Sequence, residues 1–265
     1  MTPAQINKEL MKIKNIGTCT IFTIVNGLYV WYLPMFVYLL RRSYPEYKLH
    51  ILADTEEPEI LALPGVKGFK SIHGHQLDGG YRAAAMRFLY DDDTLTTSDY
   101  VFITDVDMMI IREANSIVDQ HMLSLRKNNL ECYDNYLNNG DRCPGVHFVT
   151  RDWWKRTEDA REEESQRLYE FEHVPYDHDE KMLLRIIRDS KLPEPPAKVN
   201  PWTYHGQHLG EWRRKTTFDN SSRGNAMAAF AITSDVALME IAEHCDKKAP
   251  ALRIMDSLKL MAKTN

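Results

Sequence analysis

The stretch that decides the fold of this chain is YVFITDVDMMII, residues 100–111. Its first part, Tyr100 to Thr104, is apolar and predicts a buried strand that leads directly into Asp105-Val106-Asp107. In open α/β sheets, ligands bind just beyond the carboxyl ends of the strands. Two carboxylates in that place suit Mg²⁺ or Mn²⁺, which need oxygen ligands and keep positions open for phosphate oxygens.

An ordinary acidic turn after a strand is the alternative interpretation of Asp105 and Asp107. The apolar MMII that follows favours the metal site, because it makes the two aspartates semi-buried. Two like charges are costly to bury without a cation. We therefore expect Asp105 and Asp107 to hold a divalent cation.

The sequence on either side predicts alternating strands and helices. No charged residue occurs between Cys19 and Leu40, a run long enough to span a membrane, but Asn26-Gly27 and Pro34 interrupt it. We predict a strand, a turn and a helix there instead. The expected strands are 18–25, 49–53, 100–104, 146–149 and 230–233. The expected helices are 29–42, 79–89, 153–171, 179–190, 235–244 and 249–262, with a short element in 60–69, an extended segment in 192–202 and a loop in 204–215.

This order predicts an α/β fold: a Rossmann-like, mixed but mainly parallel sheet flanked by helices, with a helical C-terminal end. No linker long enough to separate two domains is present, so we expect residues 1–265 to form one domain. Within it, residues 17–110 form a nucleotide-binding half, 111–215 a donor and acceptor half, and 216–265 the C-terminal helices.

Composition excludes several classes of protein. The 265 residues are 43% hydrophobic and 27% charged, as in ordinary globular chains, and the net charge of −5 argues against a general nucleic-acid binder. The four cysteines form no CxxC pair, which favours reduced thiols over disulfides. The polar, charged start lacks a secretory signal, so we expect a cytoplasmic protein without a transmembrane segment. A lumenal catalytic domain of a secretory-pathway enzyme is the alternative.

A second acidic group lies in VPYDHDEKMLLRII, residues 174–187. Acids are favoured at the start of a helix, so capping explains one or two of Asp177, Asp179 and Glu180. Capping does not need all three together with His178. A carboxylate aimed from a helix N-terminus into a cleft can act as a nucleophile or stabilise an oxocarbenium-like carbon.

Two basic groups are candidates for the phosphate side of such a site. The loop YHGQHLGEWRRK, residues 204–215, contains His205 and His208, either of which can complete a metal shell. It also carries Arg213 to Lys215, which can neutralise a diphosphate, although a solvated basic loop is the alternative. Arg87 precedes the strand at 100–104 and points either to the nucleotide or into a buried ion pair.

Together these motifs resemble glycosyltransferases of the GT-A fold. The opening residues 18–45 and KLHILAD look like the first βαβ unit of that fold, and the resemblance implies that Thr23, Asn26 and Tyr29 lie near the base and ribose. The stretch MRFLYDDDTLTTSDYVFITDVDM resembles family 8, which includes glycogenin, and implies that Arg87 contacts the nucleotide.

DVDM and HDE are similar to family 6, the blood-group and α-1,3-galactosyl transferases. That resemblance implies that Glu180 lies under the anomeric carbon as nucleophile or stabilising carboxylate, that Asp179 helps to hold the donor sugar, and that Arg213 to Lys215 close over the diphosphate. The chain departs from family 8 at Pro144-Gly145, where that family has Asn-Gly, and at HGQHLG, so His205 and His208 both stay candidate ligands.

The expected activity is transfer of a sugar from a UDP-sugar to a glycan or other hydroxyl acceptor, with Mn²⁺ or Mg²⁺ and with retention of configuration. Asp105 would serve both the metal and the nucleotide. The alternatives are a metal-dependent nucleotidyltransferase or other phosphoryl enzyme, and a non-catalytic nucleotide-binding protein of the same fold.

Overall fold

The structure is a computed structural model of the chain. It describes residues 17–69, 71–72, 75–76, 81–197, 205–209 and 226–262. The predicted basic residues Arg213, Arg214 and Lys215 lie outside the described residues.

The centre of the molecule is a six-stranded sheet in the order β3-β2-β1-β6-β9-β8. Its strands are β3 (Val66–Gly68), β2 (Lys48–Ala53), β1 (Cys19–Val25), β6 (Tyr100–Ile103), β9 (His147–Thr150) and β8 (Tyr133–Asp134). The first four run parallel, and β9 pairs antiparallel with both β6 and β8. All residues of β1 are buried, as expected of a central parallel strand covered on both faces.

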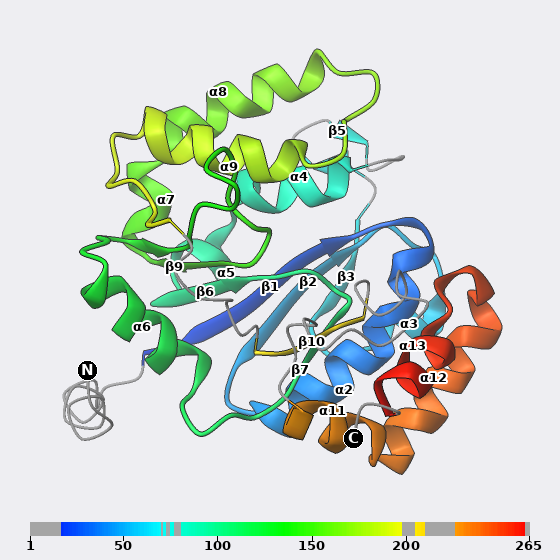
Figure 1. The fold of residues 1–265 in the computed structure, drawn as a ribbon. Helices are drawn as coiled ribbons and strands as arrows, with labels where there is room; N and C mark the ends of the chain where they lie inside the picture. Colours follow the sequence, from blue (N-terminus) through cyan, green and yellow to red (C-terminus); the bar gives the residue numbers. More distant parts are fainter. Residues whose placement is uncertain are drawn as a thin grey trace.

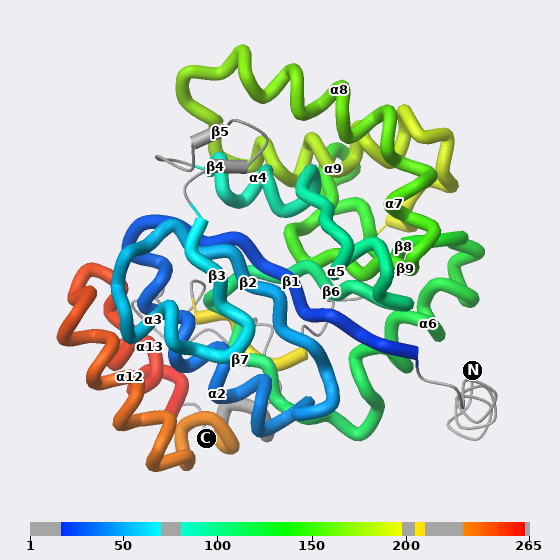
Figure 2. Tube along the Cα trace, turned by 180° about the vertical axis from the view of Figure 1, so that it is seen from behind, coloured from blue at the N-terminus to red at the C-terminus, as the bar shows by residue number. Residues whose placement is uncertain are grey.

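Helices cover both faces of this sheet (Figures 1 and 2). On one side α4 (Arg82–Leu89) packs against β1, and α8 (Glu158–Tyr169) and α9 (His178–Asp189) pack against α4. On the other side lies α2 (Leu33–Ser43), with α12 (Val236–Lys248) packed against it and α13 (Ile254–Ala262) packed against α12. The strongly apolar faces of α2 and α9 supply much of the core, including Phe36 and Leu40 from α2 and Leu183 and Ile187 from α9.

The remaining elements complete the described chain. They are η1 (Gly27–Tyr32), α3 (Pro58–Leu61), β4 (Ser71–Ile72), β5 (His75–Gln76), α5 (Asp93–Thr96), β7 (Met108–Ile110), α6 (Ile117–Lys127), α7 (Asp152–Arg156), β10 (Gly206–His208), α11 (Ala226–Thr233) and η2 (Pro250–Leu252). β7 and β10 pair antiparallel in a small sheet of their own. β4 and β5 form a second two-stranded sheet.

The predicted α/β architecture is confirmed: the sheet is mixed and mainly parallel, helices flank it, and helices close the C-terminal end. Five local predictions differ from the structure. The helix expected over 249–262 is divided into the 3₁₀ turn η2 (Pro250–Leu252) and α13 by Arg253, whose φ is +52°. Residues 230–233, expected as a strand, end helix α11, in which alanines outweigh Ile232 and Thr233. The helix expected over 153–171 is broken at Thr157, whose φ is −111°. The helix expected from Tyr29 begins as the 3₁₀ turn η1. Residues 206–208, expected in a loop, form β10.

The order of strands reverses between β1 and β6. The chain moves from β1 outward to β2 and β3, and then returns to place β6 on the other side of β1. Such a switch point leaves a crevice outside the carboxyl ends of the two strands, where ligands of α/β proteins bind. Here the crevice lies between Val25 of β1 and Ile103 of β6.

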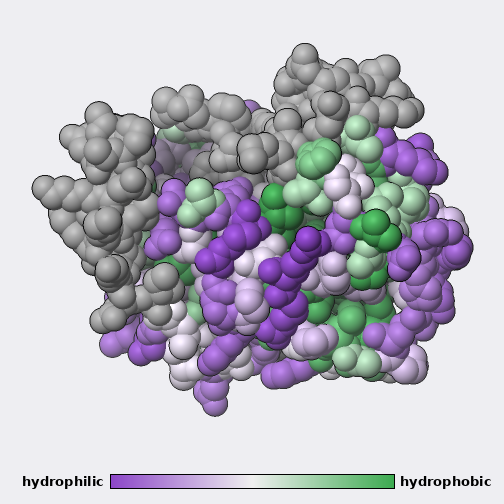
Figure 3. Space-filling view, turned by 90° about the horizontal axis from the view of Figure 1, so that it is seen from below, coloured by the Kyte–Doolittle hydropathy of each residue, from purple (hydrophilic) through white to green (hydrophobic). Residues whose placement is uncertain are grey.

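Two further predictions concern thiols and membranes. All four cysteines are free, in agreement with the preference for reduced thiols, and the structure buries each of them. No helix within the described residues has the length and apolar character needed to span a bilayer. On the face seen in Figure 3, hydrophilic residues make up most of the coloured surface, and hydrophobic ones gather toward one side.

Candidate active site

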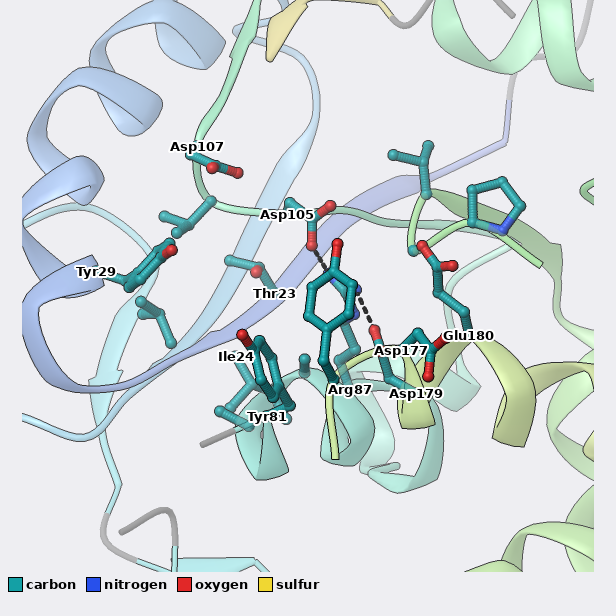
Figure 4. A pocket seen from close by; sticks show the side chains of 18 of the residues that line it. Thr23, Ile24, Tyr29, Tyr81, Arg87, Asp105, Asp107, Asp177, Asp179 and Glu180 are labelled. Atoms are coloured by element: carbon teal, nitrogen blue, oxygen red, sulfur yellow. Dashed lines mark hydrogen bonds and ion pairs between the residues drawn. The ribbon is translucent and has the colours of Figure 1, made fainter. Parts of the chain in front are cut away.

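A cavity of about 550 Å³ opens at the switch point (Figure 4). Its walls come from the carboxyl ends of β1 and β6, from α4, from the loop before β9 and from the start of α9. The predicted site residues that line it are Thr23, Asn26, Tyr29, Arg87, Asp105, Asp107, Asp179, Glu180 and His208. The tertiary fold therefore brings together acids that lie about seventy residues apart in sequence.

The pairing of β7 with β10 carries His208 to the two aspartates. His208 stands opposite Met108, one residue after Asp107, and the Leu209 backbone N–H donates to the Asp107 carbonyl at 2.9 Å. Side chains alternate between the two faces of a strand, so His208 faces the cavity while Gln207 is buried behind it. The register of this one antiparallel pair therefore determines that His208 faces the two aspartates.

Asp105, Asp107 and His208 form a group that can hold a divalent cation. One ligand atom from each side chain lies within 4.8 Å of the others, and His208 Nε2 lies 3.5 Å from Asp107 Oδ1 and 3.9 Å from Asp105 Oδ2. Carboxylates suit Mg²⁺ and Mn²⁺, whereas an imidazole nitrogen is more typical of transition metals. The donor set therefore fits a divalent cation.

Gly206 is the residue that permits this pairing. Its φ is +134°, and a Cβ there would stand 1.9 Å from the Met109 carbonyl oxygen. We expect Gly206→Ala to push β10 off β7 and to lower Mn²⁺ affinity on the order of 10- to 100-fold, as when the support of a metal ligand is lost. Calorimetric titration of Mn²⁺ measures this. Gly140→Ala is the matched control, because Gly140 also has a positive φ but a Cβ there meets nothing. Equal Mn²⁺ affinity of the Gly206 variant and wild type would refute the role of this strand pair.

Arg87 joins the metal group to the carboxylates of α9. Its side chain is buried, Nη1 pairs with Asp105 Oδ1, and Nη2 donates to Asp179 Oδ2 at 3.0 Å (Figure 4). Burial acts to raise the pKa of Asp105, but Arg87 and then His208 outweigh it and the pKa is lowered. Of the two alternatives for Arg87, the structure contains the buried ion pair, and the side chain also lines the cavity.

Gly145 leaves the space that this guanidinium needs. A Cβ at Gly145 would stand 2.2 Å from Arg87 Nη2 and 3.4 Å from Asp105 Oδ2. Pro144-Gly145 therefore preserves the close approach of the loop before β9 to Arg87. The sequence did not single out this glycine for such a role.

Glu180 is the carboxylate with the most unusual environment. Burial, and next the charge of Asp179, raise its pKa to about 7. Arg142 opposes this shift: its Nε lies 3.2 Å from Glu180 Oε2, and its Nη1 donates to Asp177 Oδ2 at 3.0 Å. A carboxyl group that titrates near neutrality in a cavity is typical of catalytic sites.

Tyr29 stands on the wall formed by the end of β1. In Figure 4, Tyr29 and Thr23 lie on the opposite side of Asp105 from Glu180. Asn26 ends the strand and Gly27 turns the chain with φ +56° into η1, which presents the partly exposed Tyr29. The cavity therefore has one wall from β1 and a facing wall from α9.

His205 does not join the metal group. It lies in a buried network in which its Nε2 is 3.1 Å from His121 Nε2, and its Nδ1 is 3.5 Å from Glu113 Oε2. His121 Nδ1 in turn lies 2.7 Å from Asp134 Oδ2. His205 thus connects β10 to α6 and β8, and of the two candidate histidines only His208 faces the aspartates.

The residues that line the cavity and that sequence reasoning missed include Asn138, Arg142, Tyr81 and Tyr176. Tyr81 directly precedes α4 and Tyr176 directly precedes Asp177 at the start of α9. The available signal was that Tyr81 lay in the first turn of the helix predicted over 79–89, next to two glycines, and that Tyr176 lay just before the helix predicted over 179–190, next to Asp177. His178, in contrast, packs its ring 4.6 Å from that of Phe171 and does not line the cavity.

No protein-family model matches the chain, and no curated protein matches its sequence. Among solved structures, the chain is similar to the apo form of the glycosyltransferase GlyE of Streptococcus pneumoniae TIGR4, with 14% identity and a TM-score of 0.41 over 69% of this chain and 45% of that chain. A second GlyE crystal structure gives 17% identity and a TM-score of 0.43 over 69% and 46%. The chain is thus matched to less than half of the length of GlyE.

The chain is also similar to an active-site mutant of LgtC, with 12% identity and a TM-score of 0.45 over 77% of this chain and 80% of that chain. The galactosyltransferase LgtC in complex with donor and acceptor sugar analogs gives 12% identity and a TM-score of 0.40 over 78% and 82%.

Proposed function

We propose that this protein is a metal-dependent glycosyltransferase that transfers a sugar from a UDP-sugar to a hydroxyl acceptor with retention of configuration. The observation that carries the proposal is one cavity that holds both a cation group, Asp105, Asp107 and His208, and a separate carboxylate pair, Asp179 and Glu180. A diphosphate held by the first group would leave its sugar in the same cavity as the second group.

The two walls of the cavity bind different parts of the donor. Residues 17–110 supply the nucleotide side, where Thr23, Asn26 and Tyr29 receive base and ribose. Asp105, Asp107 and His208 would hold Mn²⁺ or Mg²⁺, which neutralises the charge that develops on the leaving diphosphate. Arg87 orients Asp105 and Asp179 at once, so the metal side and the sugar side keep a fixed separation.

Glu180 supplies the second carboxylate that retention requires. In the first displacement a Glu180 oxygen forms a bond to the anomeric carbon, and the electron pair of the breaking C–O bond leaves with UDP. In the second, the acceptor oxygen attacks from the opposite face and releases the Glu180 carboxylate, while the acceptor proton passes to a phosphate oxygen or water. Asp179, held by Arg87, positions the sugar hydroxyls.

Removal of the metal tests the proposal directly. We expect slow release of UDP when the protein is incubated with Mn²⁺ and one member of a panel of UDP-sugars and GDP-sugars. After exhaustive treatment with EDTA, release should fall on the order of 100-fold or more and recover with added Mn²⁺. Chromatography of the products separates the alternatives, since pyrophosphate would indicate nucleotidyl transfer. Unchanged turnover by metal-stripped protein would overturn the metal-dependent mechanism.

A further inference from the structure

Tyr81 and Tyr176 form an exposed aromatic pair in the wall of the cavity. Their rings stand edge to face, with centroids 5.2 Å apart and an interplanar angle of 73°. Both line the cavity, yet 43% of Tyr81 and 57% of Tyr176 is exposed. Large aromatic side chains that stay accessible beside polar groups in a concave site are typical of ligand binding.

We propose that Tyr81 and Tyr176 are an acceptor subsite that binds the apolar face of an uncharged pyranose. This inference rests on the proposed glycosyl transfer and names the substrate class for its second step. Tyr29 already supplies an aromatic ring on the β1 wall, where the base of the donor is placed. The Tyr81–Tyr176 pair belongs to the N-terminal ends of α4 and α9, close in sequence to Arg87 and Glu180.

The pair is held in place before any ligand arrives. Asp177, the residue after Tyr176, adopts the left-handed conformation with φ +63°. Its carboxylate accepts a hydrogen bond from Arg142 at 3.0 Å and lies 3.2 Å from Lys181 Nζ. Tyr81 directly precedes α4, which packs against α9. A preorganised aromatic surface loses little conformational entropy on binding, which favours affinity.

The charges of the described wall favour an uncharged acceptor. The carboxylates Asp105, Asp177, Asp179 and Glu180 all face the cavity. Both arginines of this wall are already paired, Arg87 with Asp105 and Asp179, and Arg142 with Asp177 and Glu180. An acidic acceptor, such as a uronic acid or a sugar phosphate, would meet like charge at short range. A neutral hexose instead offers hydroxyls to the carboxylates and C–H groups to the tyrosine rings.

The test separates acceptor binding from donor binding. We expect Tyr176→Ala and Tyr81→Ala to raise the KM for methyl hexosides and neutral disaccharides about five- to tenfold, the effect of losing one aromatic contact. The Kd for UDP with Mn²⁺, measured by calorimetry, should stay within about twofold of wild type. Tyr176→Phe keeps the ring and should keep the acceptor KM near wild type.

Tyr169→Ala is the matched control, because Tyr169 is 54% exposed on α8 and does not line the cavity. The subsite would be refuted by an unchanged acceptor KM in both alanine variants, by a weakened UDP affinity instead, or by a preference of wild type for phosphorylated or uronic-acid acceptors. Saturation-transfer NMR with the same methyl hexosides detects sugar binding without requiring turnover. Binding that is lost in Tyr176→Ala, in a protein that releases no UDP, would uphold the subsite and overturn the transferase.

Discussion

Asp107→Asn is expected to abolish the metal-dependent activity of the protein while leaving its fold intact. The change is isosteric and removes one of the two carboxylates that we propose as ligands of a shared cation. Asp107 is the better choice for substitution, because loss of Asp105 would also remove one of the two carboxylates that pair with the buried guanidinium of Arg87. We expect UDP release from the donor to fall on the order of 100- to 1,000-fold.

The binding of Mn²⁺ gives a second measurement for the same variant. A ligand at 100 times its Kd stabilises a folded protein by about 2.7 kcal/mol, so Mn²⁺ should raise the Tm of the wild type measurably. The rise should disappear in Asp107→Asn. Asp159→Asn, an exposed acid at the start of α8, is the control and should respond to Mn²⁺ like the wild type. An equal rise of Tm in Asp107→Asn and the wild type would contradict the assignment of this residue as a ligand.

Glu180→Gln should inactivate the enzyme and at the same time stabilise it at alkaline pH. Glutamine has the size of glutamate but cannot attack the anomeric carbon, so we expect transfer to fall on the order of 1,000-fold. The stability gain follows from the raised pKa of about 7. The folded wild type prefers the protonated Glu180 carboxyl, so this group contributes fully to the free energy of unfolding below the ordinary glutamate pKa. The contribution is lost as the pH rises through about 7.

The pH profile distinguishes this effect from a general change in packing. In EDTA at pH 8 the glutamine variant should be more stable than wild type by about 1–2 kcal/mol, a figure reduced to allow for the partial exposure of the side chain. Near pH 4.5 the two should unfold at the same temperature. Glu158→Gln, an exposed glutamate of α8, should show no such crossover. Transfer of sugar by Glu180→Gln at the wild-type rate would contradict the assigned role of Glu180.

The local pattern of the sequence was sufficient to predict the main strands and helices of the fold. The uncharged run from Cys19 predicted a buried strand, a turn at Asn26 and a helix, and residues 100–107 predicted a strand that ends on two aspartates. These features are local, because an apolar run and the residues that end it determine whether a strand is buried and where it stops. Where propensities compete over few residues, as at 230–233, the local pattern predicted the wrong element.

The composition of the site depended on tertiary structure. The choice of His208 over His205 follows from the register of β10 against β7, and a shift by one residue would turn the other face of the strand to the cavity. The ion pairs of Arg87 with Asp105 and Asp179 join β6 to α9 through a space that Gly145 leaves open. The pKa of Glu180 likewise depends on burial and on charges from several elements.

The sequence by itself determined that a buried parallel strand ends in paired carboxylates, because strand burial and termination are encoded in neighbouring residues. Only the tertiary structure decided which histidine meets those carboxylates, which arginines are already paired, and that Tyr81 and Tyr176 share one wall. These properties depend on distances between segments far apart in the chain, and such distances are set by strand register and helix packing rather than by any local pattern.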